Sequence, residues 1–289
     1  MNRDIFKILA VLALLIGLLS VKYFFFPSST GEGPAPVDVV SPEQPDALEP
    51  PSTPVNTGEP IDLRPVEPEE SLSSGQDSLK SQLDTELQKQ SIFELIKRNF
   101  PDDYETTLAS LADLVHQVGA EAQAKQIGFE LTSRLRRENA DALLTAPRAD
   151  LKKTIQDNLV IYEHLLATEG PLPCARYAAL GPAGYGPLDT TLTELTSSAT
   201  LAVFETIEAG RNSGQTAWSP PTDNDYALLR EELGNRGIDL DMLTAFENAV
   251  ADDEGTCHTT ITYFQILTDS EGAAYDRILA AAVHGLAAN

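Results

Sequence analysis

The order of apolar and polar positions divides the chain into three parts, and the first is an uninterrupted apolar run at Ile5–Phe26. A helix of that length is about 33 Å long, close to the ~30 Å hydrocarbon thickness of a bilayer. Lys7 and Lys22 lie near its two ends, where long side chains can reach the interface. The pattern predicts a transmembrane anchor at residues 5–26, preceded by a short cytoplasmic tail at residues 1–4.

The charges that flank this run predict its orientation. Arg3 and Lys7 lie at its start, whereas no basic residue follows Lys22 until Arg64. Under the positive-inside rule the N-terminus stays in the cytoplasm and the rest of the chain is extracytoplasmic. A cleaved signal peptide is the alternative. The run ends in bulky aromatic residues and a proline, with no small-x-small cleavage site, which favours retention.

Residues 27–77 are expected to form a disordered, acidic linker. Residues 27–70 contain 11 of the 19 prolines and almost no aromatic residues. Such a segment cannot bury enough apolar surface to offset the entropy of folding. We therefore expect a spacer that holds residues 78–289 away from the membrane.

Residues 78–289 show the apolar spacing of amphipathic helices, with Leu79, Leu83 and Leu87 as its first example. Helices are expected over the following segments: about 79–100, 102–118, 120–144, 150–166, 190–210, 226–233, 239–246, 256–267 and 271–286. This pattern predicts an all-α fold, a compact bundle of seven to nine helices.

Two segments of this domain are expected to be irregular, and a third is ambiguous. Glu169–Pro187 and Arg211–Pro221 are rich in glycine and proline, which predicts loops. Thr259–Phe264 contains several β-branched and aromatic residues, so a strand competes with a helix there.

Composition restricts the class of partner. The chain carries 44 acidic and 20 basic residues, a formal net charge of −24. This charge repels phosphate backbones and anionic lipid surfaces, so nucleic acid is not an expected partner. A charged partner should be basic.

Cys174 and Cys257 are the only two cysteines. In an oxidising compartment two cysteines in one domain predict a disulfide, and two buried free thiols are the alternative. The chain-entropy model gives a bridge of this span roughly 4–5 kcal/mol.

Catalytic and metal-binding patterns are weak. The four histidines form no H-E-x-x-H motif, and the acidic clusters lack the glycine and distal glutamate of a calcium loop. We expect no metal and no cofactor. If Cys257 were free, His258 could activate it as a nucleophile, which a disulfide excludes. An enzyme would have to use carboxylates such as Glu163 and Asp189 with His164.

Three aromatic residues are the candidate partner-binding residues: Tyr177 and Tyr185 in the first expected loop and Trp218 in the second. Aromatic residues on irregular loops are typical of recognition sites, although such rings also cover cores. No Asn-x-Ser/Thr sequon is present, which favours a bacterial periplasm over a eukaryotic lumen. We therefore expect a single-pass inner-membrane protein whose periplasmic domain binds another envelope protein. A tethered carboxylate-based hydrolase and a small-ligand-binding module are the alternatives.

Overall fold

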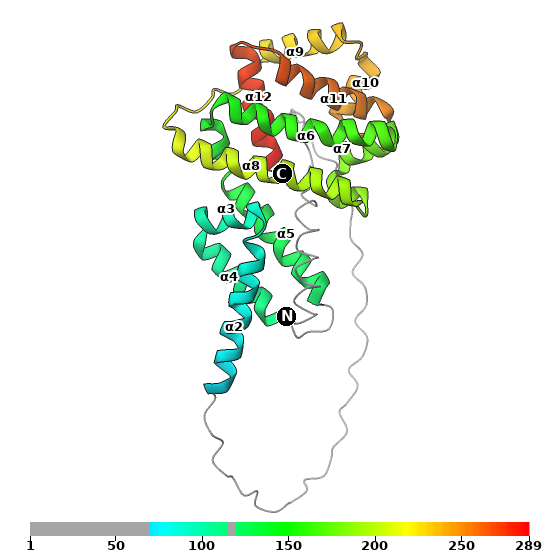
Figure 1. The fold of residues 1–289 in the computed structure, drawn as a ribbon. Helices are drawn as coiled ribbons and strands as arrows, with labels where there is room; N and C mark the ends of the chain where they lie inside the picture. The colour runs from blue at the N-terminus through cyan, green and yellow to red at the C-terminus, as the bar shows by residue number, and fades with distance from the viewer. Residues whose placement is uncertain (1–69, 115–119, 289) are drawn as a thin grey trace, which may run out of the picture.

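The computed structural model describes residues 70–114 and 120–288, and every regular element within them is helical (Figure 1). The elements are α2 (Glu70–Leu87), α3 (Ser91–Asn99), α4 (Pro101–Leu114), α5 (Ala120–Glu138), the 3-10 helix η1 (Ala140–Thr145), α6 (Arg148–Thr168), α7 (Pro171–Tyr185), α8 (Thr190–Ser213), α9 (Asp223–Asn235), α10 (Leu240–Glu247), α11 (Glu254–Asp269) and α12 (Ala273–Ala288). The all-α prediction is confirmed, with more helices than expected.

The predicted anchor, Ile5–Phe26, and the linker up to residue 69 lie outside the described residues. Among the described helices none combines the length and the apolar character needed to span a bilayer.

The core is built on α6, which packs along α8 on one side and against α7 and α11 on the other. Where α6 and α8 cross, Thr154 and Thr206 hydrogen-bond to each other through their hydroxyls at 2.8 Å, which satisfies two buried polar groups. Six rings form a chain of edge-to-face or tilted contacts through the core: Tyr185, Tyr177, Tyr162, Phe264, Tyr263 and Phe246. The chain runs from α7 through α6 and α11 to α10.

The N-terminal helices form a separate layer in which α4 packs against α2, α3 and α5 (Figure 1). Asp84 of α2 accepts hydrogen bonds from Lys97 and from the hydroxyl of Tyr104, at 2.9 and 2.8 Å. The helix α2 begins at Glu70, earlier than the start expected at residue 78. Residues 70–77 contain no proline, so nothing in them prevents the helix from extending toward the N-terminus.

The helix expected at 120–144 is divided in two. α5 ends at Glu138 and η1 follows from Ala140. The side-chain amide of Asn139 donates to the carbonyl of Leu135 at 2.6 Å and so caps the end of α5. An asparagine whose side chain bonds the preceding turn is a common way to end a helix.

The prediction of a loop at Glu169–Pro187 is wrong, because α7 occupies most of this segment. Pro171 begins the helix, where a missing backbone N–H costs nothing. Gly181 adopts a non-helical conformation with φ 66° just before Pro182, so two helical segments of α7 meet there at a kink. Gly186, with φ 117°, ends it. The glycines and prolines therefore mark the start of α7, the kink between its two helical segments and its end.

The strand alternative at Thr259–Phe264 is also wrong, since these residues lie in α11. The hydroxyl of Thr260 donates to the carbonyl of Thr256 at 2.7 Å, four residues back. A threonine can satisfy its hydroxyl in this way inside a helix. Tyr263 and Phe264 are buried on this helix, so packing outweighs its β-branched composition.

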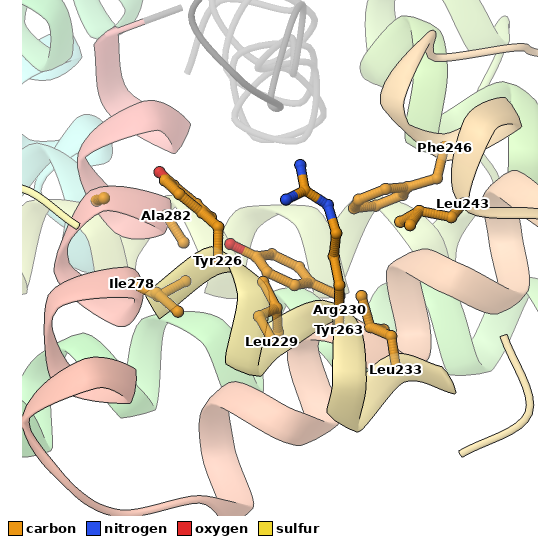
Figure 2. Close-up of a pocket in the computed structure, with 10 residues that line it drawn as sticks. Tyr226, Leu229, Arg230, Leu233, Leu243, Phe246, Tyr263, Ile278 and Ala282 are labelled. Carbon is orange, nitrogen blue, oxygen red and sulfur yellow. The ribbon is translucent and has the colours of Figure 1, made fainter. Parts of the chain in front are cut away.

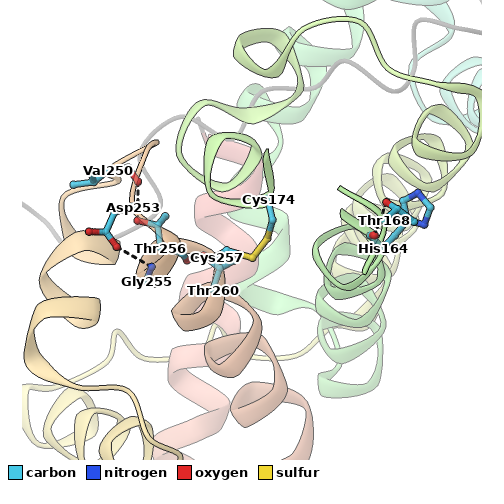
Figure 3. Close-up of a disulfide and its surroundings, with 9 residues drawn as sticks. All are labelled: His164, Thr168, Cys174, Val250, Asp253, Gly255, Thr256, Cys257 and Thr260. Atoms are coloured by element: carbon cyan, nitrogen blue, oxygen red, sulfur yellow. Dashed lines mark hydrogen bonds between the residues drawn. A yellow bond between two sulfur atoms is a disulfide. The ribbon is translucent and has the colours of Figure 1, made fainter. Parts of the chain in front are cut away.

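Cys174 and Cys257 lie together as a disulfide between α7 and α11, with Cα atoms 5.4 Å apart, as the sequence predicted (Figure 3). Both side chains are fully buried. Cys257 lies in the first turn of α11, where Asp253 caps the helix by accepting the backbone N–H of Gly255 at 2.7 Å. The hydroxyl of Thr256 donates to the carbonyl of Val250 at 2.8 Å. The bridge thus joins α7 to a helix start that is already fixed.

The close approach of α8 to η1 depends on Gly210. A Cβ atom at this position would come within 2.5 Å of the carbonyl oxygen of Ala142, which is backbone and cannot rotate away. We expect Gly210→Ala to lower the free energy of unfolding by about 2–3 kcal/mol, as overpacking does. Gly234→Ala is the matched control, because no atom lies within 4 Å of its added methyl group. In α9 that change should stabilise by about 0.5–1 kcal/mol. Equal melting temperatures for the two variants by circular dichroism would refute the close-contact explanation.

Candidate partner-binding pocket

Four helices at the end of the molecule far from α2 enclose a small apolar pocket (Figures 1 and 2). It has a volume of about 50 Å³. Its lining consists of Tyr226, Leu229, Arg230 and Leu233 from α9, Leu243 and Phe246 from α10, Tyr263 from α11, and Ile278, Ala281 and Ala282 from α12. Burial raises the pKa of Tyr263, so its hydroxyl stays protonated and neutral. Most of the lining side chains are therefore apolar, and Tyr226, Arg230 and Tyr263 add polar groups among them.

A charged pair borders the pocket. Nη2 of Arg230 lies 3.5 Å from Oε1 of Glu247, which follows the lining residue Phe246 in α10. This Glu247 oxygen is buried and accepts no hydrogen bond among the described residues. A buried carboxylate oxygen without a donor is costly, and a donor brought by a ligand would satisfy it. Glu247 does not itself line the pocket, so its pair with Arg230 stands beside the pocket as a charged border.

The helices that form the pocket are strongly acidic. Residues 223–288 contain 13 aspartates and glutamates against three arginines. Each arginine is already paired with a carboxylate: Arg230 with Glu247, Arg236 with Glu232, and Arg277 with Asp225. The surplus negative charge around an apolar pocket attracts cationic partners.

The wall between α9 and α12 is held by Asp225 and Arg277. The guanidinium of Arg277 donates from Nε and Nη2 to the two carboxylate oxygens of Asp225, at 2.9 and 2.6 Å. Asp225 also accepts the backbone N–H of Thr222 at 2.7 Å and so caps α9. These bonds, with Arg277 the largest contributor, hold the pKa of Asp225 well below its usual range.

The Asp225–Arg277 pair makes the stability of the protein fall at low pH. Because the pKa of Asp225 is lowered by folding, its stabilising effect is complete above the unfolded pKa of about 3.9 and is lost as pH falls through the folded value. We expect Asp225→Asn to lower the melting temperature by several degrees, equally at pH 7 and pH 5. Below about pH 4 the difference from wild type should shrink. Asp269→Asn is the control, because Asp269 forms only an exposed pair with Arg236 at 3.5 Å. If the melting-temperature difference between Asp225→Asn and wild type were the same at pH 7 and pH 3, the low pKa assigned to Asp225 would be contradicted.

The three aromatic residues predicted for partner binding lie elsewhere. Tyr177 is only 2% exposed and belongs to the core ring chain. Tyr185 is half-buried at the end of α7, and its hydroxyl donates to Glu169 at 2.5 Å. Trp218 is half-buried over η1, where its indole N–H donates to the carbonyl of Ala146 at 3.0 Å. The structure brings Tyr177 and Tyr185 together, with ring centroids 5.7 Å apart, and places Trp218 in the irregular segment between α8 and α9.

The residues considered for carboxylate catalysis do not converge on a cavity. Glu163 is exposed on α6 and accepts a hydrogen bond from Gln265 at 3.2 Å. Asp189 caps α8 by accepting the backbone N–H of Leu192 at 2.7 Å. Neither residue, nor His164, lines the pocket at α9–α12. In the part of the chain that the structure describes, no three histidine, cysteine or acidic residues are grouped as metal ligands.

Comparison with known proteins finds no matching family model, no similar curated protein and no similar solved structure. The function must therefore be inferred from this chain's own residues.

Proposed function

We propose that the helical domain is a binding module, and that its α9–α12 pocket takes one apolar side chain from a basic segment of another protein. The observation that carries this proposal is the apolar pocket at the centre of the most acidic part of the described chain.

The size of the pocket supports a side-chain anchor over a free small molecule. Sites for drug-sized ligands enclose roughly 300–1,000 Å³, whereas this pocket measures about 50 Å³. That volume holds the end of a single apolar side chain. Leu240, which is 76% exposed, lies one turn before the lining residue Leu243 on α10 and adds apolar surface beside it.

The charges support a basic partner. A lysine or arginine beside the anchor would meet the surplus of negative charge in residues 223–288, which contain 13 acidic residues against three arginines. Electrostatic attraction of this kind speeds association and selects against acidic partners. In this proposal residues 5–26 anchor the chain in the inner membrane, residues 27–77 act as a spacer, and the partner is a periplasmic or envelope protein with an exposed basic segment.

A peptide selection tests the proposal. Random twelve-residue peptides displayed on phage are selected against the full-length protein in detergent. We expect the recovered peptides to share one large apolar residue flanked by lysine or arginine. Their affinity should fall as salt concentration rises.

Matched variants then locate the binding site. Ala281→Leu fills the pocket from a partly exposed position on α12 and should reduce affinity at least about tenfold, the equivalent of 1.4 kcal/mol. Leu228→Ala is the control, because Leu228 is 47% exposed on α9 and does not line the pocket. Recovery of acidic peptides, or equal binding to Ala281→Leu and wild type, would refute the proposal.

A further inference from the structure

A second cavity contains a buried arginine that has no counter-charge. Arg136 of α5 is 4% exposed and lines a cavity of about 20 Å³ where α5, α6, α7, α8 and α12 meet. The other lining residues are Asn158, Ile161, Tyr177, Thr196, Ala199, Thr200, Val203 and Leu286. This cavity is separate from the α9–α12 pocket and shares no lining residue with it.

The Nε–H group of Arg136 has no hydrogen-bond partner within the described residues. This nitrogen is buried, and the ion pairs with Asp103 and Glu138 in this part of α5 are formed by Arg134. Burial, reinforced by the charge of Arg137, lowers the pKa of Arg136 to about 10. The group is therefore still protonated at neutral pH. Leaving a buried charge uncompensated is strongly destabilising, so an anion beside Arg136 would stabilise the folded protein.

The cavity supplies a second donor and no competing acid. Nδ2 of Asn158 donates one hydrogen to the carbonyl of Thr154 at 2.8 Å, and an amide nitrogen carries two. The hydroxyl of Thr196 donates to the carbonyl of Leu192 at 2.6 Å, so Tyr177 is the donor in its 3.3 Å contact with Thr196. The donors left for a ligand are thus the guanidinium of Arg136 and one amide hydrogen of Asn158.

We propose that this cavity binds a small monoanion, of the size of a chloride ion or a carboxylate group, between Arg136 and Asn158. A cavity needs roughly 10–15 Å³ to admit one water-sized occupant, so about 20 Å³ admits one such anion and excludes phosphate esters and nucleotides. A water molecule in the same place would satisfy the Nε–H group but not the charge. The ligand neutralises a charge at the junction of five helices and thereby stabilises their packing.

Chloride binding can be measured directly on the full-length protein in detergent. The ³⁵Cl NMR line should broaden in the presence of wild-type protein and sharpen when a competing anion is added. Melting temperature should rise to saturation with chloride when methanesulfonate, which is larger than chloride and has no carboxylate group, keeps the ionic strength constant. Competition with formate shows whether the site also accepts carboxylates or only halides. Competition by formate would extend the site to carboxylates, and its absence would restrict the site to halides.

Three variants assign the effect to Arg136. Arg136→Gln should abolish the line broadening, and Arg136→Lys, which keeps a charge, should weaken chloride binding at least tenfold. Arg137→Gln is the matched control, because it removes the same charge from an exposed neighbour and should leave binding unchanged. If Arg136→Gln does not fold, Arg136→Lys and Arg137→Gln still decide the outcome. Absence of broadening with wild type, or equal loss in the Arg136 and Arg137 variants, would overturn the proposal.

Discussion

Replacing Cys174 and Cys257 together by alanine is expected to lower the free energy of unfolding by about 4 kcal/mol. The two cysteines are 83 residues apart, and the bridge joins α7 to α11 with α8, α9 and α10 between them. Closing so long a loop removes much of the conformational entropy of the unfolded chain, which is the main source of the effect. Urea unfolding of the double variant against oxidised wild type measures it.

Reduction of the wild-type protein controls for the substitutions themselves. Reduced wild type and the double variant should lose similar stability, because both cysteine side chains are fully buried and alanine fits the same space. Thiol labelling of the denatured, unreduced protein should detect no free cysteine. A loss below about 1 kcal/mol, or two titratable thiols, would show that the bridge does not constrain the chain.

Phe264→Ala is the second large effect, with an expected loss of about 3–5 kcal/mol. Phe264 is 1% exposed on α11, and its ring lies 5.5 Å from that of Tyr162 and 5.6 Å from that of Tyr263. Removing it leaves a cavity in the middle of the core ring chain. The loss should exceed that of most single core substitutions, because two aromatic neighbours lose contacts as well.

Two further variants test whether the loss of stability comes from the missing aromatic ring or from substitution in general. Phe264→Leu keeps most of the apolar volume and should cost clearly less than alanine. Leu240→Ala removes an exposed leucine and should change stability by no more than about 0.5 kcal/mol. Chemical denaturation of all three gives the comparison. Equal losses for Phe264→Leu and Phe264→Ala would contradict the packing argument.

Much of the fold could be predicted from local patterns. The spacing of Leu151, Ile155 and Leu159 predicted α6, and all three side chains are buried. The α7 helix was missed because composition alone does not distinguish prolines in a first helical turn from prolines in a loop. The positions of these residues allow the helix, because Pro171 is its first residue and Gly181 adopts the non-helical conformation at the kink.

The two cavities have no local sequence signal. Leu233, Phe246 and Ile278 come from three helices, and only the packing of those helices brings them together. Arg136 lies within the basic segment Arg134–Arg137, and such a segment predicts a solvent-exposed helix face. One helical cue was present, since Arg136 is four residues after Thr132 and both side chains are buried on α5. Tyr177 illustrates the opposite case, because an aromatic residue among glycines and prolines proved to be part of the core.

The central claim is that an apolar side chain of a basic segment enters the α9–α12 pocket, and methyl NMR tests it most directly. A basic peptide recovered in the selection is titrated into protein labelled at its isoleucine and leucine methyl groups. We predict chemical-shift changes at Leu229, Leu243 and Ile278, which line the pocket, and none at Leu286, which lines the Arg136 cavity. Shifts centred away from the pocket, with Leu243 and Ile278 unchanged, would contradict the claim.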